Sequence, residues 1–148
     1  MNTKYRQGIA VLALVGFGAL IYASYSDKTQ QTANTAGDSP QIGRAIVEIT
    51  VPDLQGKAIL GQVAYDAKCA SCHGKDAVGQ VGVAPPLVHK IYEPSHHGDG
   101  AFLRAARNGV RSHHWRFGNM PPVEGISDAE VGTIVAYVRA LQRANGIN

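Results

Sequence analysis

Cysteine is almost absent from this sequence, because its 148 residues include only Cys69 and Cys72. A bridge between two cysteines three positions apart would close too small a loop to stabilise a fold strongly. A structural zinc site usually has four ligands in two separated pairs, and the sequence has no second Cys-x-x-Cys. A thioredoxin-type redox pair expects a βαβ surround, which a mostly helical pattern lacks. These absences argue against the common uses of paired cysteines.

Charged residues are also scarce, at 17% of the chain, and the formal net charge is only +3. Nucleic-acid-binding domains usually show a larger and clustered excess of lysine and arginine, so we set that function aside. With 45% hydrophobic residues, the chain is neither disordered nor a multi-span membrane protein. Its length suits one domain of ordinary size plus an appendage.

One long stretch has no charge at all: residues 8–25, "GIAVLALVGFGALIYASY", which follow a short leader with Lys4 and Arg6. Eighteen helical residues rise about 27 Å, close to the thickness of a bilayer core and longer than a signal-peptide core. We therefore predict an uncleaved N-terminal transmembrane helix within residues 1–25, with a removed signal peptide as the alternative. In both cases Lys4 and Arg6 stay in the cytoplasm and the rest is exported.

Residues 26–41, "SDKTQQTANTAGDSPQ", have no aliphatic side chain larger than alanine and predict a flexible linker. Residues 42–148 then form the folded domain. The stretch "AIVEITV", residues 45–51, alternates weakly and is ended by Pro52. Since no convincing second strand is available to pair with it, we expect an extended arm that lies against the domain surface.

Helical periodicity dominates the rest of the domain. A first helix is predicted over about residues 56–69, with Gly61 in its middle at a cost of about 1 kcal/mol relative to alanine. The apolar residues that recur there at helical spacing are Ile59, Leu60, Val63, Ala64 and Ala67. A second helix, over about residues 99–108, is expected to end at Gly109 and to turn inward Phe102, Ala105 and Ala106.

The last helix is the most clearly marked. Ser127 and Glu130 form a capping-box pattern at its start, and Arg139 and Arg143 fall in its last turns, where they would complement the helix dipole. The residues along its predicted inward face are Val131, Ile134, Val135, Val138 and Leu141.

His73 directly follows the cysteine pair and completes the pattern Cys-x-x-Cys-His. With the other uses of paired cysteines set aside, this pattern predicts covalent attachment of one haem. The thiols of Cys69 and Cys72 would add to the two haem vinyl groups, and the His73 imidazole would be held under the iron as an axial ligand. The pattern uses every cysteine of a domain that is predicted to be exported and helical.

Haem iron needs a second axial ligand or an open face. The exported domain offers one methionine, Met120, and five further histidines: His89, His96, His97, His113 and His114. We predict Met120, because "FGNMPP" can hold an irregular loop against a flat ligand. A thioether ligand favours reduced iron and raises the potential, which suits electron transfer. The alternative is that Met120 only fills a gap in the core.

In these features residues 56–145 resemble the single-haem class I cytochromes c. "GQVAY" is similar to that family's first helix, and "IVAY" is similar to part of its terminal helix. The resemblance implies an all-α, cytochrome c-like bundle of roughly three to five helices around a covalently bound haem. It also implies that Gly61 and Tyr65 cross the terminal helix at Ile134 and Tyr137, which would explain the costly glycine.

The stretch "APPL", residues 84–87, resembles the family's Gly-Pro-Asn-Leu turn. This resemblance implies that the Pro85 carbonyl accepts a hydrogen bond from the second ring nitrogen of His73, which fixes the orientation of the imidazole. Ala84 and Pro86 depart from the family's turn.

Two histidine doublets, His96-His97 and His113-His114, are not explained by the resemblance. We favour the interpretation that they are exposed residues near the haem edge, some of them hydrogen-bonded to haem propionates together with Trp115. The alternative is a copper or zinc site, since imidazole binds both metals. Adjacent histidines do not easily face one ion, so such a site would be expected to take one histidine from each doublet.

The resulting hypothesis is a membrane-tethered, mono-haem c-type cytochrome that carries single electrons and is not an enzyme. Its partners would be respiratory or other membrane redox proteins, with the haem domain on the periplasmic side of a bacterial inner membrane and the N-terminus in the cytoplasm. Two alternatives stay open: a haem enzyme or gas sensor in which Met120 is labile, and a copper- or zinc-binding module built on the histidine doublets.

Overall fold

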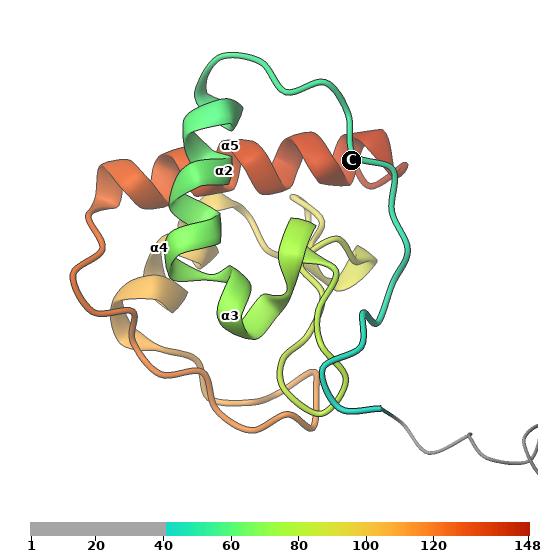
Figure 1. Cartoon of the computed structure of the whole chain (residues 1–148). Coiled ribbons are helices and arrows are strands. Elements are labelled where there is room, and N and C mark those ends of the chain that lie inside the picture. The colour runs from blue at the N-terminus through green and yellow to red at the C-terminus, as the bar shows by residue number, and fades with distance from the viewer. Residues whose placement is uncertain (1–40) are drawn as a thin grey trace, which may run out of the picture. The chain divides into compact units, whose positions relative to one another are not determined.

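The computed structural model describes residues 41–148, which form helices and irregular loops without any strand (Figure 1). The all-α class is therefore confirmed for this part of the chain. In chain order, with η for a 3-10 helix, the elements are α2 (Lys57–Lys68), α3 (Ala70–His73), η1 (Lys75–Ala77), η2 (Lys90–Tyr92), α4 (Asp99–Asn108) and α5 (Asp128–Ala144).

The predicted membrane segment lies outside the described residues, as does the linker except for Gln41. Between residues 41 and 148, no helix combines the length and the apolar character that crossing a membrane requires.

Helix α5 begins as predicted, with a complete capping box. The backbone N–H of Glu130 donates to Ser127 Oγ at 3.2 Å, and the backbone N–H of Ser127 donates to Glu130 Oε2 at 2.8 Å. Two of the free N–H groups at the helix start are thus satisfied. Its predicted inward face is buried along its whole length, and it comprises Val131, Ile134, Val135, Val138 and Leu141.

Helix α2 lies across α5 at very short range (Figure 1). A Cβ placed on Gly61 would lie 1.9 Å from the backbone oxygen of Thr133, so only glycine allows this approach. One turn further on, the rings of Tyr65 and Tyr137 pack with centroids 5.4 Å apart, and both side chains are fully buried. The crossing of the two helices at Gly61 is therefore confirmed.

Helix α2 faces the core differently from what its aliphatic residues suggest. Ile59, Leu60 and Val63, which indicated the helix, are 50%, 63% and 68% exposed. Its buried residues are Ala58, Gly61 and Tyr65. The reason is the close crossing at Gly61: α2 turns the face with Ala58, Gly61 and Tyr65 toward the core, and the large aliphatic side chains then point away from it.

The arm ahead of α2 follows the domain surface, as predicted. Near its start, the Arg44 carbonyl accepts from the Val81 N–H at 2.8 Å, and at its end Thr50 exchanges two hydrogen bonds of 2.8 Å with the side chain of Asn145. Ile49 and Leu54 pack against the main core. The arm thus joins the loop around residue 80 to the end of α5.

Helix α4 matches its predicted range and ends at Gly109, whose φ of 72° is the left-handed conformation typical of a residue that follows a helix. Ala106 is buried, and Phe102 packs against both hydrophobic clusters of the domain.

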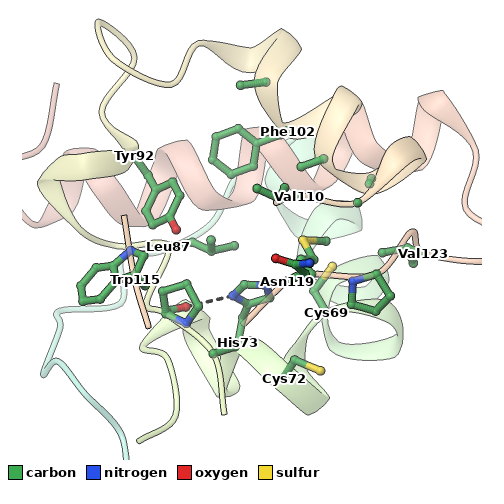
Figure 2. Close-up of a pocket in the computed structure, with 18 of the residues that line it drawn as sticks. Cys69, Cys72, His73, Leu87, Tyr92, Phe102, Val110, Trp115, Asn119 and Val123 are labelled. Carbon is green, nitrogen blue, oxygen red and sulfur yellow. Dashed lines mark hydrogen bonds between the residues drawn. The ribbon is translucent and has the colours of Figure 1, made fainter. Parts of the chain in front are cut away.

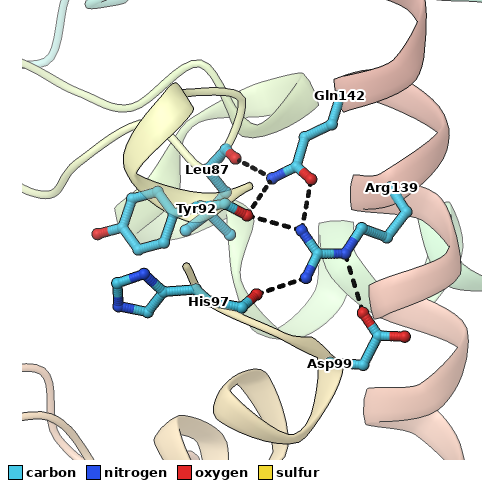
Figure 3. Close-up of polar contacts among 6 residues, drawn as sticks. All are labelled: Leu87, Tyr92, His97, Asp99, Arg139 and Gln142. Carbon is cyan, nitrogen blue, oxygen red and sulfur yellow. Dashed lines mark hydrogen bonds and ion pairs between the residues drawn. The ribbon is translucent and has the colours of Figure 1, made fainter. Parts of the chain in front are cut away.

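A buried cation joins α5 to the loop between η2 and α4 (Figure 3). Arg139 has only 8% of its side chain exposed, and it donates to the carbonyls of Tyr92 at 2.6 Å and His97 at 2.5 Å. It also pairs with Asp99 at 2.9 Å and with the Gln142 side chain at 2.6 Å. Arg139, which the sequence placed in the last turns of this helix, is therefore also a structural anchor.

Replacing Gly61 by alanine is expected to destabilise the protein by about 1 to 3 kcal/mol, because the new methyl group collides with backbone that cannot swing aside. The matched control is Gly132→Ala in α5, where a Cβ meets nothing within 4 Å. There alanine should stabilise by about 0.5 to 1 kcal/mol through its higher helix propensity. Urea unfolding of the haem-loaded protein measures both changes, and equal effects at the two sites would contradict the close crossing.

Replacing Arg139 by methionine should lower the free energy of unfolding by at least about 3 kcal/mol, because buried carbonyl groups lose their charged donor. Arg143→Met, at an exposed position on the same helix, should change it by less than about 0.5 kcal/mol. The same unfolding experiment compares them, and a small effect at both positions would argue against the anchor.

Candidate functional site

The Cys-x-x-Cys-His motif forms a single helical turn at the end of α2. The N–H of Cys69 still donates to the Tyr65 carbonyl at 2.8 Å, and the N–H of His73 donates back to the Cys69 carbonyl at 2.9 Å. Gly74 then ends the turn with a φ of 75°. This single turn brings both thiols and the imidazole to one cavity, which all three residues line.

The His73 ring has a fixed orientation. Its Nδ1 lies 2.9 Å from the carbonyl oxygen of Pro85 (Figure 2), which is the contact that the resemblance implied. Because a carbonyl only accepts, Nδ1 carries the proton and Nε2 keeps a free lone pair. Burial lowers the pKa of His73, against the opposing effect of the Pro85 hydrogen bond, so the ring is held neutral as a metal ligand must be.

The turn at residues 84–87 places the Pro85 carbonyl against His73 even though Ala84 and Pro86 depart from the family's turn. Gln80 and Ala84 exchange two backbone hydrogen bonds of 2.9 and 3.2 Å, which close a tight loop just before Pro85. Pro86 is fully buried, and its ring nitrogen lies 2.4 Å from where a Cβ on Gly79 would be. Ala84 and Pro86 therefore do not disturb the carbonyl that receives His73.

The two thiols do not resemble a catalytic dithiol. Cys69 and Cys72 form no disulfide, and burial, with a smaller contribution from Cys72, raises the pKa of Cys69 to about 11. Redox-active Cys-x-x-Cys pairs instead have a thiol pKa below its ordinary value. This agrees with the sequence argument against a redox pair and leaves the thiols free for covalent attachment.

The motif opens onto a cavity of about 630 Å³, which lies within the range of about 300 to 1,000 Å³ usual for ligand and cofactor pockets. Its walls come from α3, the loop after Ala84, α4, the loop of residues 109–123 and the first turns of α5. Most of the side chains are apolar, and Figure 2 shows several of them around the motif, namely Leu87, Phe102, Val110 and Val123.

A buried polar atom without a partner lies in the wall of this cavity. Among the described residues, the indole Nε1 of Trp115 is the one buried side-chain nitrogen or oxygen with no hydrogen bond. Burial raises the pKa of Tyr92, and the nearby Trp115 side chain partly opposes this rise. No hydrogen bond of normal geometry, however, joins the indole N–H to the Tyr92 hydroxyl. Since buried donors are almost always paired, this N–H fits an acceptor group on a bound ligand, such as a haem propionate.

Met120 lies in the same cavity wall, on a loop whose backbone is closely held. It exchanges two backbone hydrogen bonds with Val110, of 2.9 and 3.0 Å, and the backbone N–H of Ser112 donates to Asn119 Oδ1 at 2.9 Å. A Cβ on Gly109 would lie 2.4 Å from the Met120 carbonyl. The structure thus brings His73 and Met120 to one pocket, while their role as axial ligands stays a prediction.

The other histidines divide into two groups. His89 does not line the cavity, because its Nδ1 caps η2 by accepting from the Ile91 N–H at 3.2 Å. The two doublets lie at the cavity, and desolvation together with its histidine neighbours lowers the pKa of His114. The sequence reasoning missed Tyr92 as a wall residue, since it belongs to no motif, whereas Phe102 was expected to face inward and does line the cavity.

The comparisons with known proteins agree with this site. The family model for cytochrome c matches residues 58–142. Cytochrome c-555 from Chlorobaculum thiosulfatiphilum is 33% identical over 84 residues, which cover 55% of this chain and 92% of that protein. No solved structure matches the chain. Because the family model covers more than half of the sequence, from the start of α2 to the end of α5, the chain belongs to the cytochrome c family.

Proposed function

We propose that this chain is a membrane-tethered, mono-haem c-type cytochrome that carries single electrons between membrane redox partners. Membership of the cytochrome c family supports the broader statement, a haem-based electron carrier. The observation that carries the proposal is the neutral, oriented imidazole of His73, with its free Nε2, beside two unpaired thiols in one cofactor-sized apolar cavity.

The residues of the cavity fit haem c. Cys69 and Cys72 would hold the porphyrin through thioether bonds, and His73 and Met120 would ligate the iron. The Trp115 N–H would donate to a propionate. When bound, the haem supplies a one-electron ferric–ferrous couple.

The protein's own contribution is to fix the ligands and exclude water. Pro85 orients the His73 ring and raises its basicity as a ligand, since a hydrogen-bonded imidazole is a stronger donor. A thioether from Met120 would favour the reduced state and raise the potential. The apolar walls keep water from the centre, so few water molecules and polar groups must reorient when the charge of the cofactor changes.

The tether and the location are carried by the sequence outside the described residues. The uncharged stretch of residues 8–25 and the basic leader support an anchor in a bacterial inner membrane, with the N-terminus cytoplasmic and the haem domain periplasmic. A linker of 16 residues, 26–41, would span about 20 to 24 Å on average, so the domain could turn between neighbouring membrane complexes.

Expression with haem-maturation machinery should give one haem per chain that stays attached after denaturation, because two thioether bonds hold it. The double variant Cys69→Ser, Cys72→Ser should lose this attachment. Denaturing gels stained for haem peroxidase activity, together with reduced and oxidised spectra of the membrane and soluble fractions, make the measurement. Colourless protein with reactive thiols would refute the haem, while coloured protein found only in the soluble fraction would refute the anchor.

Replacing Met120 by alanine should remove the iron–thioether absorption band, lower the midpoint potential and allow carbon monoxide to bind the reduced iron, because one axial position opens. Arg116→Ala, an exposed change on the same loop outside the cavity wall, is the control and should keep the band. Rapid carbon monoxide binding by the unaltered protein would contradict the carrier and favour a haem enzyme or gas sensor.

A further inference from the structure

Three imidazoles from two separate loops converge at the rim of the cavity. His96 and His97 lie in the turn after η2, and His114 lies in the loop between α4 and α5. One ring nitrogen from each lies within 4.8 Å of the others, and His96 Nε2 lies 3.3 Å from His114 Nε2. We call these residues the three-histidine cluster. Neither the proposed electron transfer nor the haem ligation uses it.

The spacing of the cluster suits a metal ion. Two nitrogen ligands at about 2.05 Å from a tetrahedral zinc ion lie roughly 3.3 Å apart. The observed separation of the His96 and His114 nitrogens is 3.3 Å. A ring nitrogen of His97 lies within 4.8 Å of the other two, so His97 is the third candidate ligand.

His97 is already held in the orientation of a ligand. Its Nδ1 donates to the Ile91 carbonyl at 2.7 Å, which leaves Nε2 as the free nitrogen. Its backbone is fixed from both sides, because its N–H donates to the Glu93 carbonyl at 2.8 Å and its carbonyl accepts from Arg139 at 2.5 Å. Figure 3 shows the ring directed away from Arg139. Metal-binding histidines typically have such a hydrogen bond on the second nitrogen.

The cluster differs in composition from the metal site that the sequence offered as an alternative. That alternative took one histidine from each doublet, whereas the cluster contains both His96 and His97, together with His114. The pair lies in a turn, where neighbouring side chains can point to the same side, and its ring centroids are 4.7 Å apart. His113 is directed elsewhere, with its Nδ1 at 2.8 Å from the Arg111 carbonyl.

We propose that His96, His97 and His114 bind one divalent transition-metal ion, of the zinc or copper(II) class, at the rim of the haem cavity. Neutral imidazole is a preferred ligand of both ions. Three protein ligands leave a fourth position for water, as in open zinc sites. His96 and His114 are exposed, so the ion reaches the site directly from solvent.

The test is a titration of the haem-loaded full chain, freed of metal by a chelator, with zinc chloride and in parallel with copper(II). Zinc and haem are quantified after desalting, and calorimetry gives the affinity. One zinc per haem is expected, and His96→Ala and His114→Ala should each weaken binding at least about tenfold, as expected when a coordinating side chain is lost. His113→Ala is the matched control, in the same doublet but outside the cluster, and should bind as the unaltered chain does.

Electron paramagnetic resonance of the copper(II) form should show hyperfine coupling to several imidazole nitrogens, and this coupling should change in His114→Ala but not in His113→Ala. Substoichiometric binding, or equal affinity in all three variants, would overturn the site. If metal binding is absent while His96→Ala shifts the midpoint potential, the cluster serves the haem propionates instead, which also overturns the proposal. Helical circular dichroism and the haem spectrum verify that each variant is folded.

Discussion

The close crossing of α2 and α5 at Gly61 is the constraint on which the rest of the structure depends. It places the backbone of α2 against the Thr133 carbonyl and seats Tyr65 against Tyr137. Both tyrosine hydroxyls then reach beyond the crossing to the residues that follow the Cys-x-x-Cys-His turn. Tyr65 donates to the Gly74 carbonyl at 2.8 Å, and Tyr137 donates to Asp76 at 2.9 Å. The position of the functional turn is thus set by the packing of two helices that are distant in sequence.

The same contacts support a backbone conformation that would not persist alone. Asp76 and Ala77 have φ values of 54° and 62°, in the left-handed region that costs roughly 1 to 2 kcal/mol for each non-glycine residue. Tyr137 holds the Asp76 side chain, and the Ala77 carbonyl accepts from the Leu87 N–H at 2.9 Å. This strained bend reverses the chain after His73 and brings the loop with Pro85 under the imidazole.

The sequence predicted what depends on neighbours in the chain and missed what depends on distant contacts. The capping box at Ser127 and the range of α4 follow from local patterns, and both are confirmed. The outward direction of Leu60 and the burial of Arg139 could not be read from periodicity, because each is decided by another segment that packs there. The resemblance to a family supplied one long-range contact, between His73 and Pro85, that residue patterns alone do not contain.

The anchors of this fold lie largely outside the cavity that they shape. The capping box, the crossing at Gly61 and the Arg139 network involve the flanks of the helices and loop backbone, whereas the cavity wall is made of the side chains between them. The Arg139 network, for example, fixes the backbone carbonyls of Tyr92 and His97, while the side chains of both residues line the cavity. An electron carrier requires this arrangement, because the less the protein must rearrange on reduction, the faster the electron can be passed on.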